Sequence, residues 1–530
     1  MVVAQEARAA RIGTEILEQG GNAVDAAVAT GFALAVTYPR AGNLGGGGYM
    51  LIHLADRNLD TAIDYRETAP AATRRDTFLD EHGEADPRKS RDSGLAVGVP
   101  GSVAGLAYAH EKYGSGKFTL AQLIAPAIVL ARDGIAVTDD SADSLPLSQS
   151  RLARWPSTTK IFFAAGAPLA AGATLVQHDL ADTLTAIAKE GPRAFYRGAV
   201  AGNIAAAVRE AGGLMTPEDL KNYRPLEHAP VRGRYRGYDV LSMPPSSSGG
   251  VILIEMLNIL AGYHDLAADD ARRVHLLVEA MKLAYADRAA FLGDPASVEL
   301  PIARLTSEAY AAELRAQIDP DHARPSAEIR PALAPPREGG NTTHFSVVDR
   351  FGNAVANTTT LNFSYGLGLV AEGTGVLLNN ELDDFAAKPG APNAYGLLGG
   401  EANAPAGGKR PLSSMTPTIV LKDGAPFLVT GSPGGSRIIT AVLQVIVNVI
   451  DRKLPLADAV AQPRLHHQWW PDVVLVERGF SPDLIRALEA RGDRVVEALP
   501  PTSTNSILVT PDGLVGAADN RSRGALAAGY

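Results

Sequence analysis

Thr342 is the residue of this sequence best placed to act as a nucleophile. It follows a run rich in proline and glycine, residues 331–340, which predicts an exposed loop. Residues 343–349 are mostly β-branched or aromatic, a pattern typical of a strand. If the chain is cut before Thr342, this residue gains a free α-amine that can serve as the base for its own hydroxyl. Without a cut Thr342 is an ordinary strand residue, and its position alone favours that interpretation.

Three nearby segments also carry groups that could take part in acyl transfer. Residues 358–362 follow on the expected partner strand, where a threonine hydroxyl could reach Thr342. Residues 381–384 hold three acids, which by themselves are best explained as a solvated turn. The tandem glycines within residues 431–437 lie between a strand and a helix. Their backbone N–H groups can converge on one oxyanion, or they can simply form a tight turn with a helix cap.

Two other motifs suggest ligand chemistry but do not carry it. Four glycines at residues 45–48 lack the lysine of a phosphate-binding loop and precede a strand, so we expect close backbone packing there. His466 and His467 are adjacent, and neighbouring side chains of a strand point to opposite faces. We therefore assign no metal and no cofactor.

Composition narrows the class of protein. The 530 residues are 46% hydrophobic and 20% charged, as in a folded globular protein, and the net charge of -9 is spread without a basic block. Nucleic acid is therefore not an expected partner. The absence of cysteine excludes disulfides, thiolate metal sites and a cysteine nucleophile. The apolar runs are too short and interrupted for a membrane span, and the first residues lack a signal-peptide pattern.

The predicted elements change in type along the chain. The first part is mainly helical, with two strands near its start, whereas the second part contains three hairpins joined by Asp-Gly or Gly-Asn turns. The expected helices cover residues 5–19, 23–36, 102–113, 120–133, 251–260, 271–291, 436–450 and 482–491. The expected strands cover residues 49–54, 61–66, 345–349, 354–361, 418–422, 427–430, 507–510 and 514–517. This order predicts a layered α+β body with antiparallel sheets in its middle.

Taken together, the motifs resemble the γ-glutamyltranspeptidase family over nearly the whole chain. The resemblance is carried by residues 20–27, 45–48, 64–67, 342–349, 360–362, 379–385, 410–415 and 431–437. It implies the four-layer αββα fold of N-terminal-nucleophile hydrolases, in which two stacked, mainly antiparallel sheets lie between helices. It also implies a precursor that cuts itself between Asn341 and Thr342. The products would be a large subunit, 1–341, and a small subunit, 342–530, that stay together as a heterodimer.

The resemblance assigns roles at the reacting centre. Thr342 is implied to be the nucleophile, Thr360 the hydroxyl that orients it, and the N–H groups of Gly434 and Gly435 the oxyanion hole. The α-carboxylate of a glutamyl donor would bind a cation and two hydroxyls, and its α-ammonium two acids and an amide. A tyrosine in the loop 389–396 would close over the donor. The residues implied in binding are Arg66, Asn362, Glu381, Asp384, Tyr395, Ser413 and Ser414.

The implied activity is hydrolysis or transfer of the γ-glutamyl group of glutathione and related compounds, to water or to amino acids and peptides. One alternative is an acylase of the same family that acts on glutaryl amides such as cephalosporin intermediates. A glutaryl group lacks the α-ammonium, so it would leave Glu381 and Asp384 without a partner. Another alternative is a non-catalytic γ-glutamyl-binding paralogue. Bacterial members are usually periplasmic or secreted, which is the location the resemblance implies.

Overall fold

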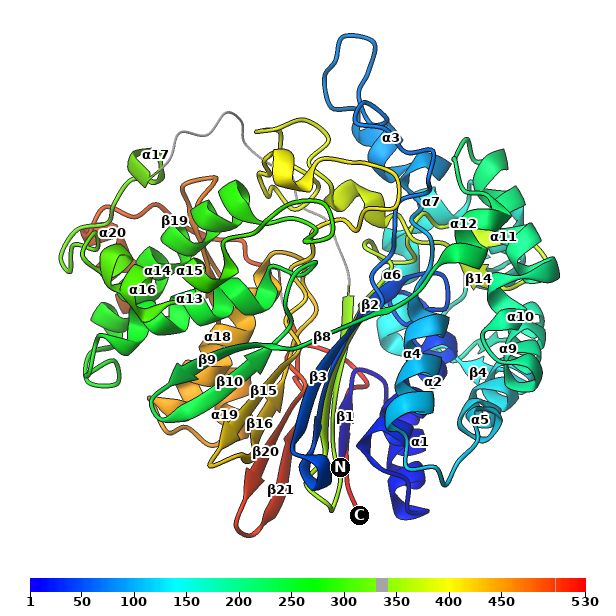
Figure 1. Ribbon diagram of the computed structural model, residues 1–530, viewed down its shortest axis with the longest axis horizontal. Coiled ribbons are helices and arrows are strands. Elements are labelled where there is room, and N and C mark those ends of the chain that lie inside the picture. The colour runs from blue at the N-terminus through cyan, green and yellow to red at the C-terminus, as the bar shows by residue number, and fades with distance from the viewer. Residues whose placement is uncertain (330–341, 501) are drawn as a thin grey trace.

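Apolar residues in alternating and continuous runs form two β-sheets that stack face to face, each covered on its outer side by helices (Figure 1). The computed structural model describes residues 1–329, 342–500 and 502–530. Side chains from both sheets, including Leu51, Ala356, Ile419 and Val429, form one buried cluster between them. The predicted four-layer αββα fold is therefore confirmed.

The seven-stranded sheet carries the hairpin that begins with Thr342. Its strand order is β22-β1-β11-β12-β2-β3-β8, and neighbouring strands are antiparallel. The predicted hairpin is present, but its first strand starts at Thr342 instead of Phe345, so Thr342 pairs directly with Thr360. The strands are β1 (Val2–Ala4), β2 (Gly47–Leu54), β3 (Leu59–Asp64), β8 (Leu226–His228), β11 (Thr342–Val348), β12 (Ala354–Thr360) and β22 (Leu526–Ala528).

The six-stranded sheet has the order β21-β20-β16-β15-β10-β9, again antiparallel. Its strands are β9 (Val231–Tyr235), β10 (Tyr238–Ser242), β15 (Thr418–Lys422), β16 (Ala425–Thr430), β20 (Ser506–Thr510) and β21 (Gly513–Ala517). Segments before and after residue 342 contribute strands to both sheets. A cut before Thr342 would therefore leave two fragments that share both sheets.

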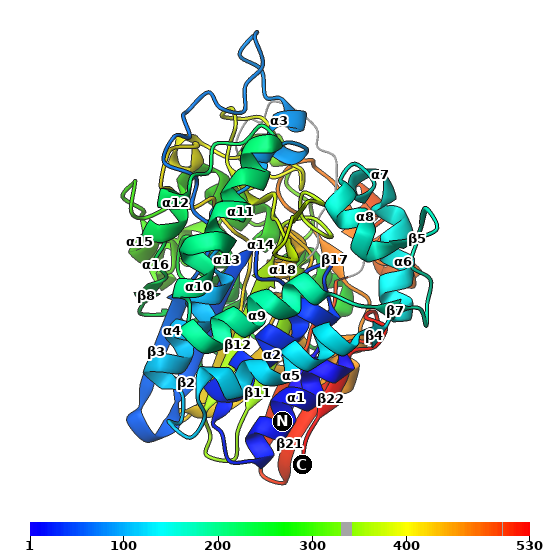
Figure 2. The ribbon, with the colours of Figure 1, turned by 90° about the vertical axis from the view of Figure 1, so that its right-hand side faces the viewer.

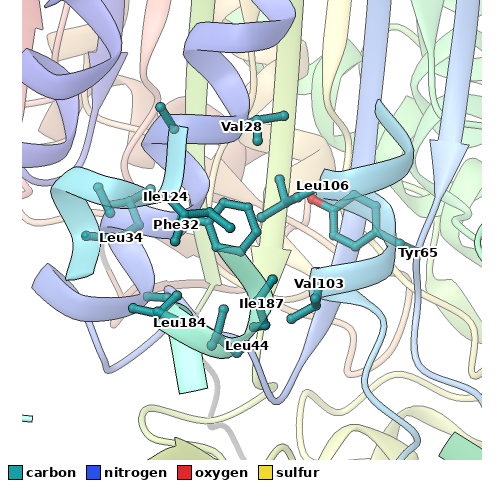
Figure 3. Close-up of a cluster of buried hydrophobic side chains, with 14 of the residues drawn as sticks. Val28, Phe32, Leu34, Leu44, Tyr65, Val103, Leu106, Ile124, Leu184 and Ile187 are labelled. Carbon is teal, nitrogen blue, oxygen red and sulfur yellow. The ribbon is translucent and has the colours of Figure 1, made fainter. Parts of the chain in front are cut away.

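Long buried helices form the two outer layers. α2 (Ala23–Thr37) is buried along its whole length, and a capping box between Asn22 and Asp25 fixes its start. Figure 3 shows Val28 and Phe32 of this helix packed with side chains from neighbouring helices. The other helices over the seven-stranded sheet include α1 (Ala7–Glu18), α4 (Ser102–Tyr113), α5 (Leu120–Asp133) and α9 (His178–Glu190). Those over the six-stranded sheet include α13 (Gly249–Ala261), α14 (Asp270–Phe291) and α18 (Arg437–Ile450).

Shorter elements complete the fold, and Figure 2 shows α6, α7 and α8 gathered as a lobe beside the main layers. The remaining helices are α3 (Pro87–Arg91), α6 (Asp139–Leu147), α7 (Gln149–Leu152), α8 (Pro156–Phe162), α10 (Arg193–Tyr196), α11 (Gly198–Glu210), α12 (Pro217–Asn222), α15 (Ile302–Leu305), α16 (Glu308–Arg315), α17 (Ser326–Ile329), α19 (Leu456–Ala461) and α20 (Pro482–Ala490). The remaining strands are β4 (Ile135–Ala136), β5 (Phe163–Ala164), β6 (Ala167–Pro168), β7 (Thr174–Leu175), β13 (Val370–Ala371), β14 (Val376–Leu377), β17 (Leu465–His466), β18 (Val474–Val476) and β19 (Val495–Glu497). Among the helices described, none is both long and apolar enough to cross a membrane.

The glycine run at residues 45–48 serves close packing, as the sequence predicts. A Cβ atom on Gly45 would lie 2.0 Å from the carbonyl oxygen of Leu377, and one on Gly48 would lie 2.4 Å from that of Thr358. Only glycine allows this approach, which brings β2 against the strand that carries Thr360.

Candidate active site

Thr342 is the first described residue of β11, and its side chain faces Thr360 across the hairpin. Their hydroxyl oxygens lie 3.4 Å apart, and Thr342 is 3% exposed. The backbone N–H of Asn362 donates to the Thr360 hydroxyl at 2.8 Å, which fixes its orientation. Asn341 lies outside the described residues, so the predicted cleavage site stays a prediction.

His344 lies two positions after Thr342 on the same face of β11. Its Nδ1 is 2.8 Å from the Thr358 hydroxyl and its Nε2 is 3.1 Å from that of Ser346, so both ring nitrogens are engaged. Burial lowers the pKa of His344 to about 3, which keeps the imidazole neutral near neutral pH. His344 therefore supports the strand and is not oriented to act as a base for Thr342.

The tandem glycines form the turn between β16 and α18. The φ angles of Gly434 and Gly435 are +130° and +58°, which side-chain-bearing residues rarely adopt. A Cβ on Gly435 would lie 2.1 Å from the ring of Tyr395. Gly435 lines the pocket that contains Thr342, whereas Gly434, the residue before it, is not among the lining residues. Because the positive end of the α18 dipole follows directly, this turn is suited to a developing negative charge.

Arg66 supplies a buried guanidinium to the same pocket. It follows β3, and its Nε donates to the carbonyl oxygen of Pro411 at 3.1 Å. Its Nη1 forms an ion pair with Glu381, and its Nη2 forms one with Asp384 at 2.5 Å. The guanidinium therefore has three partners, and two of them are the carboxylates of different residues.

The acidic cluster is not a solvated turn, so that interpretation is wrong. Residues 381–384 form the short 3-10 helix η3 (Glu381–Asp384), in which Glu381 is 1% exposed. Burial raises the pKa of Glu381 well above its ordinary value and raises that of Asp384 as well. Two arginines from a distant part of the chain offset the charge of this cluster, since Arg66 pairs with Glu381 and Asp384 and Arg91 pairs with Asp383 at 3.0 Å.

Glu67 adds a third buried carboxyl to this group. Neither of its oxygens has a hydrogen-bond partner within the described residues, and Oε2 lies 3.9 Å from Arg66 Nη1. Burial raises the pKa of Glu67 to about 7. The neutral form of Glu67 therefore predominates below pH 7. As the pH rises through that value, the Glu67 carboxylate adds a negative charge next to Arg66.

This titration predicts a pH-dependent KM. Above about pH 7 the KM for a donor with an α-carboxylate should rise by the order of tenfold, because ionised Glu67 repels that carboxylate. In Glu67→Gln the rise should vanish and KM should stay near its low-pH value. The stability that neutral Glu67 contributes is present below its ordinary pKa of 4.5 and is lost as the pH rises through about 7. Measuring KM and kcat separately between about pH 5.5 and 8.5 checks this, and an unchanged KM profile in Glu67→Gln would refute it.

Tyr395 lines the pocket, and Asn362 contacts Tyr395. Tyr395 is 6% exposed, its hydroxyl donates to the Asn362 side-chain oxygen, and the Asn362 Nδ2 donates to the carbonyl oxygen of Asn380 at 2.9 Å. The cavity left among the lining residues is about 20 Å³, which holds on the order of one water molecule. A group of the size of an amino acid does not fit this cavity in the structure as described. Asn362 does not itself line the cavity.

Ser413 and Ser414 also line the pocket, and their contacts identify a residue that the sequence did not predict. The Ser413 hydroxyl accepts from the N–H of Met415 at 3.0 Å. The Ser414 hydroxyl accepts from Nη2 of Arg288 at 3.1 Å, and Nε of Arg288 donates to the Ser248 hydroxyl at 2.9 Å. Burial lowers the pKa of Arg288 to about 10, so it stays charged at neutral pH. Nothing local in the pattern of α14 identifies Arg288, because both partners are distant in sequence.

The paired histidines lie apart from this pocket and contact different groups. His466 bonds Thr440 and Gln468 through its two nitrogens, whereas Nε2 of His467 is 3.3 Å from Asp472. Within the part of the chain that the structure describes, no group of three potential metal ligands is found.

Comparison with known proteins gives a consistent set of relatives. The family model described as Gamma-glutamyltranspeptidase matches residues 9–529. A glutathione hydrolase proenzyme of Escherichia coli strain K12 is 53% identical over 100% of this chain and 92% of its own length. A cephalosporin acylase structure from Bacillus halodurans has a TM-score of 0.86 at 28% identity and covers 100% of this chain and 95% of that one. A Helicobacter pylori gamma-glutamyltranspeptidase structure has a TM-score of 0.59 at 43% identity and covers 61% of this chain and 93% of that one.

Proposed function

This chain belongs to the gamma-glutamyltranspeptidase family, and on that premise we propose that it is a self-processing glutathione hydrolase and γ-glutamyltransferase with a threonine nucleophile. The observation that carries the proposal is one buried pocket in which Arg66, Glu381 and Asp384 lie beside Thr342. Their charges complement a γ-glutamyl group, which presents an α-carboxylate and an α-ammonium side by side.

The reaction begins with a cut between Asn341 and Thr342 that frees the α-amine of Thr342. An α-amine has a reference pKa of about 7.7 to 8.0, so part of it is unprotonated at neutral pH and can accept the hydroxyl proton. The Thr342 oxygen attacks the γ-carbonyl carbon of the donor, and the N–H groups of Gly434 and Gly435 stabilise the resulting oxyanion. The ammonium then protonates the leaving amine as the C–N bond breaks. Water or an amino-acid amine next attacks the γ-glutamyl ester and restores the Thr342 hydroxyl.

Donor recognition follows from the charges already paired in the pocket. We propose that the donor carboxylate binds the Arg66 guanidinium and accepts hydrogen bonds from the hydroxyls of Ser413 and Ser414. The donor ammonium binds the carboxylates of Glu381 and Asp384, and the side-chain oxygen of Asn362 is a further acceptor. A zwitterion inserted between Arg66 and its two acids preserves the charge balance of a site that is otherwise buried. Tyr395 closes over the bound group and excludes water.

The acylase reading is the second candidate, favoured by the cephalosporin acylase structure that covers the whole chain. The E. coli glutathione hydrolase proenzyme is much more similar in sequence. A glutaryl group would also bring no ammonium for Glu381 and Asp384 to bind. A non-catalytic binding protein would not need Thr342, Thr360 and the glycine turn in one arrangement.

The proposed products are subunits 1–341 and 342–530 held as a heterodimer, since each would supply strands to both sheets. Intact mass under denaturing conditions tests this, and we expect two masses that sum to 55.4 kDa plus one water. We also propose the periplasm or the medium as the location, by family resemblance, and cell fractionation would test it.

Substrate class is tested by comparing a γ-glutamyl anilide with the matching glutaryl anilide. The glutamyl compound should react at least a hundredfold faster in kcat/KM, since its ammonium pairs with two buried acids. A cut protein that prefers the glutaryl anilide would favour the acylase, and an uncut protein that only binds glutamate would favour the paralogue.

Substitution of Gly435 tests the proposed oxyanion hole. Gly435→Ala should lower kcat by about a hundredfold, because the added Cβ forces the turn to shift its N–H groups away from the carbonyl oxygen. Gly424→Ala is the matched control, since Gly424 also has a positive φ but no atom within 4 Å of an added Cβ. Equal kcat values in the two variants would refute the role of this turn.

A further inference from the structure

A second hollow opens on the outer helical layer, away from Thr342. Its lining residues come mainly from α4, α10 and α12 and from the residues beside these helices, and Figure 2 shows the three helices near one another. Its volume is about 600 Å³, within the range of about 300–1,000 Å³ that small-molecule sites occupy. It contains none of the residues assigned above to catalysis or donor binding.

The lining of this hollow combines an aromatic floor with a cationic rim. Tyr196 and Tyr223 form part of the floor, and their rings stack with centroids 5.8 Å apart and planes 9° apart. Four exposed cations stand around them, whereas Glu111 is the one acid among the lining residues. The rim cations are Arg193, Arg197, Lys221 and Arg224.

The rim keeps a positive potential although the whole chain is acidic. Arg193 and Lys221 each lie near a glutamate of their own segment, at 3.5 Å and 2.9 Å, and such exposed pairs are weak. Within the described residues, neither Arg197 nor Arg224 has an ion-pair partner within 4.0 Å. Nη1 of Arg224 donates to the carbonyl oxygens of Lys221 and Tyr223 at 2.8 Å and 2.6 Å, which leaves Nη2 of Arg224 and the guanidinium of Arg197 for an anion.

One residue that lines the hollow, Tyr223, also contacts Arg66, which lines the donor pocket. The Tyr223 hydroxyl donates to the backbone carbonyl oxygen of Arg66 at 2.8 Å. A second route runs through Arg410, whose Nη2 donates to the carbonyl oxygen of Arg224 at 2.9 Å. The residue after Arg410 is Pro411, and its carbonyl oxygen accepts from Nε of Arg66 at 3.1 Å. Displacement of Tyr223 or Arg224 would thus be transmitted to Arg66.

We propose that this hollow binds a small amphipathic anion free in solution, an aromatic or aliphatic carboxylate or sulfonate, and that its occupancy changes the affinity of the donor site. The apolar body of the ligand lies on the tyrosine floor and its anionic group pairs with the arginines of the rim. The binding part stands by itself, whereas the coupling part rests on the proposed role of Arg66 in donor recognition.

Binding is tested with 8-anilinonaphthalene-1-sulfonate, an aromatic sulfonate whose fluorescence rises in an apolar site. The wild-type protein should show one saturable site that weakens at least tenfold in the double variant Arg193→Glu/Arg197→Glu. Both side chains are exposed, so the fold should tolerate the change. Arg209→Glu is the matched control, because Arg209 is exposed on α11 but lines no part of the hollow. Unchanged affinity in the double variant would overturn the proposed site.

Coupling is tested by repeating the titration with saturating L-glutamate. Linkage requires that glutamate change the sulfonate Kd by the same factor by which the sulfonate changes the glutamate Kd, and we expect at least threefold. Equal sulfonate Kd values with and without glutamate would overturn the coupling. Calorimetry of L-glutamate alone reports on the donor site, so failure of the proposed function is distinguished from failure of the hollow. The protein should not sediment with phosphatidylglycerol vesicles. If it does sediment, and the double variant does not, the proposal that the ligand is free in solution would be overturned.

Discussion

Thr342→Ala should leave a single uncut chain of 55.4 kDa and lower amine release from a γ-glutamyl anilide by a thousandfold or more. The physical reason is that one residue supplies two groups, the hydroxyl that attacks and the α-amine that takes its proton. The hydroxyl faces Thr360 in a buried pocket. The alanine variant loses the hydroxyl at once and, without a cut, never gains the amine. Intact mass and initial rate, measured on the same sample, check both losses.

Thr342→Ser is the matched control for this prediction. Serine keeps the hydroxyl and loses one methyl group, so processing should slow but proceed, and some turnover should follow. The far-ultraviolet circular dichroism of both variants should match the wild type, since the side chain contributes little to the core. A Thr342→Ala protein that is still cut at this bond, or still releases amine at the wild-type rate, would refute the nucleophile assignment.

Arg66→Lys should raise the KM for the glutamyl donor by about a hundredfold with a much smaller change in kcat. Lysine keeps the positive charge, but its ammonium cannot present two parallel N–H groups to a carboxylate. It also cannot reach Glu381, Asp384 and the Pro411 carbonyl oxygen together, as the guanidinium does. Arg66→Ala is less informative, because it leaves buried acids unpaired at a cost of about 3–5 kcal/mol in stability.

Arg236→Lys is the control for the general cost of replacing an arginine that pairs with a carboxylate and donates to backbone carbonyl oxygens. Arg236 pairs with Asp451 at 3.0 Å, donates to the carbonyl oxygens of Ala261 and Leu260, and does not line the donor pocket. Its substitution should lower stability to some extent and leave the donor KM unchanged. Steady-state kinetics on both variants would separate recognition from folding, and equal KM values would contradict the assignment of the α-carboxylate to Arg66.

Sequence alone determined the features that depend on neighbouring residues. Helices α4 and α5 have the bounds predicted from their apolar spacing, and the hairpin of β11 and β12 forms around the predicted Gly-Asn turn. The glycine turn predicted between a strand and a helix is present, and Gly435 has a positive φ there, which only glycine adopts without strain. The family resemblance named the residues of the pocket, but their roles stay predictions until the variants are measured.

Tertiary structure decided which charges meet. Arg66 pairs with Glu381 and Asp384 over 315 and 318 positions of sequence, which turns an expected solvated turn into a buried cluster. Arg288 donates to Ser414 from a helix whose sequence pattern does not indicate a site. Tyr223, which lines the surface hollow, donates to the carbonyl oxygen of Arg66. Local periodicity encodes which face of an element is buried. Burial and ion pairing between distant segments arise only when the layers pack together, and these set the pKa values and the shape of the pocket.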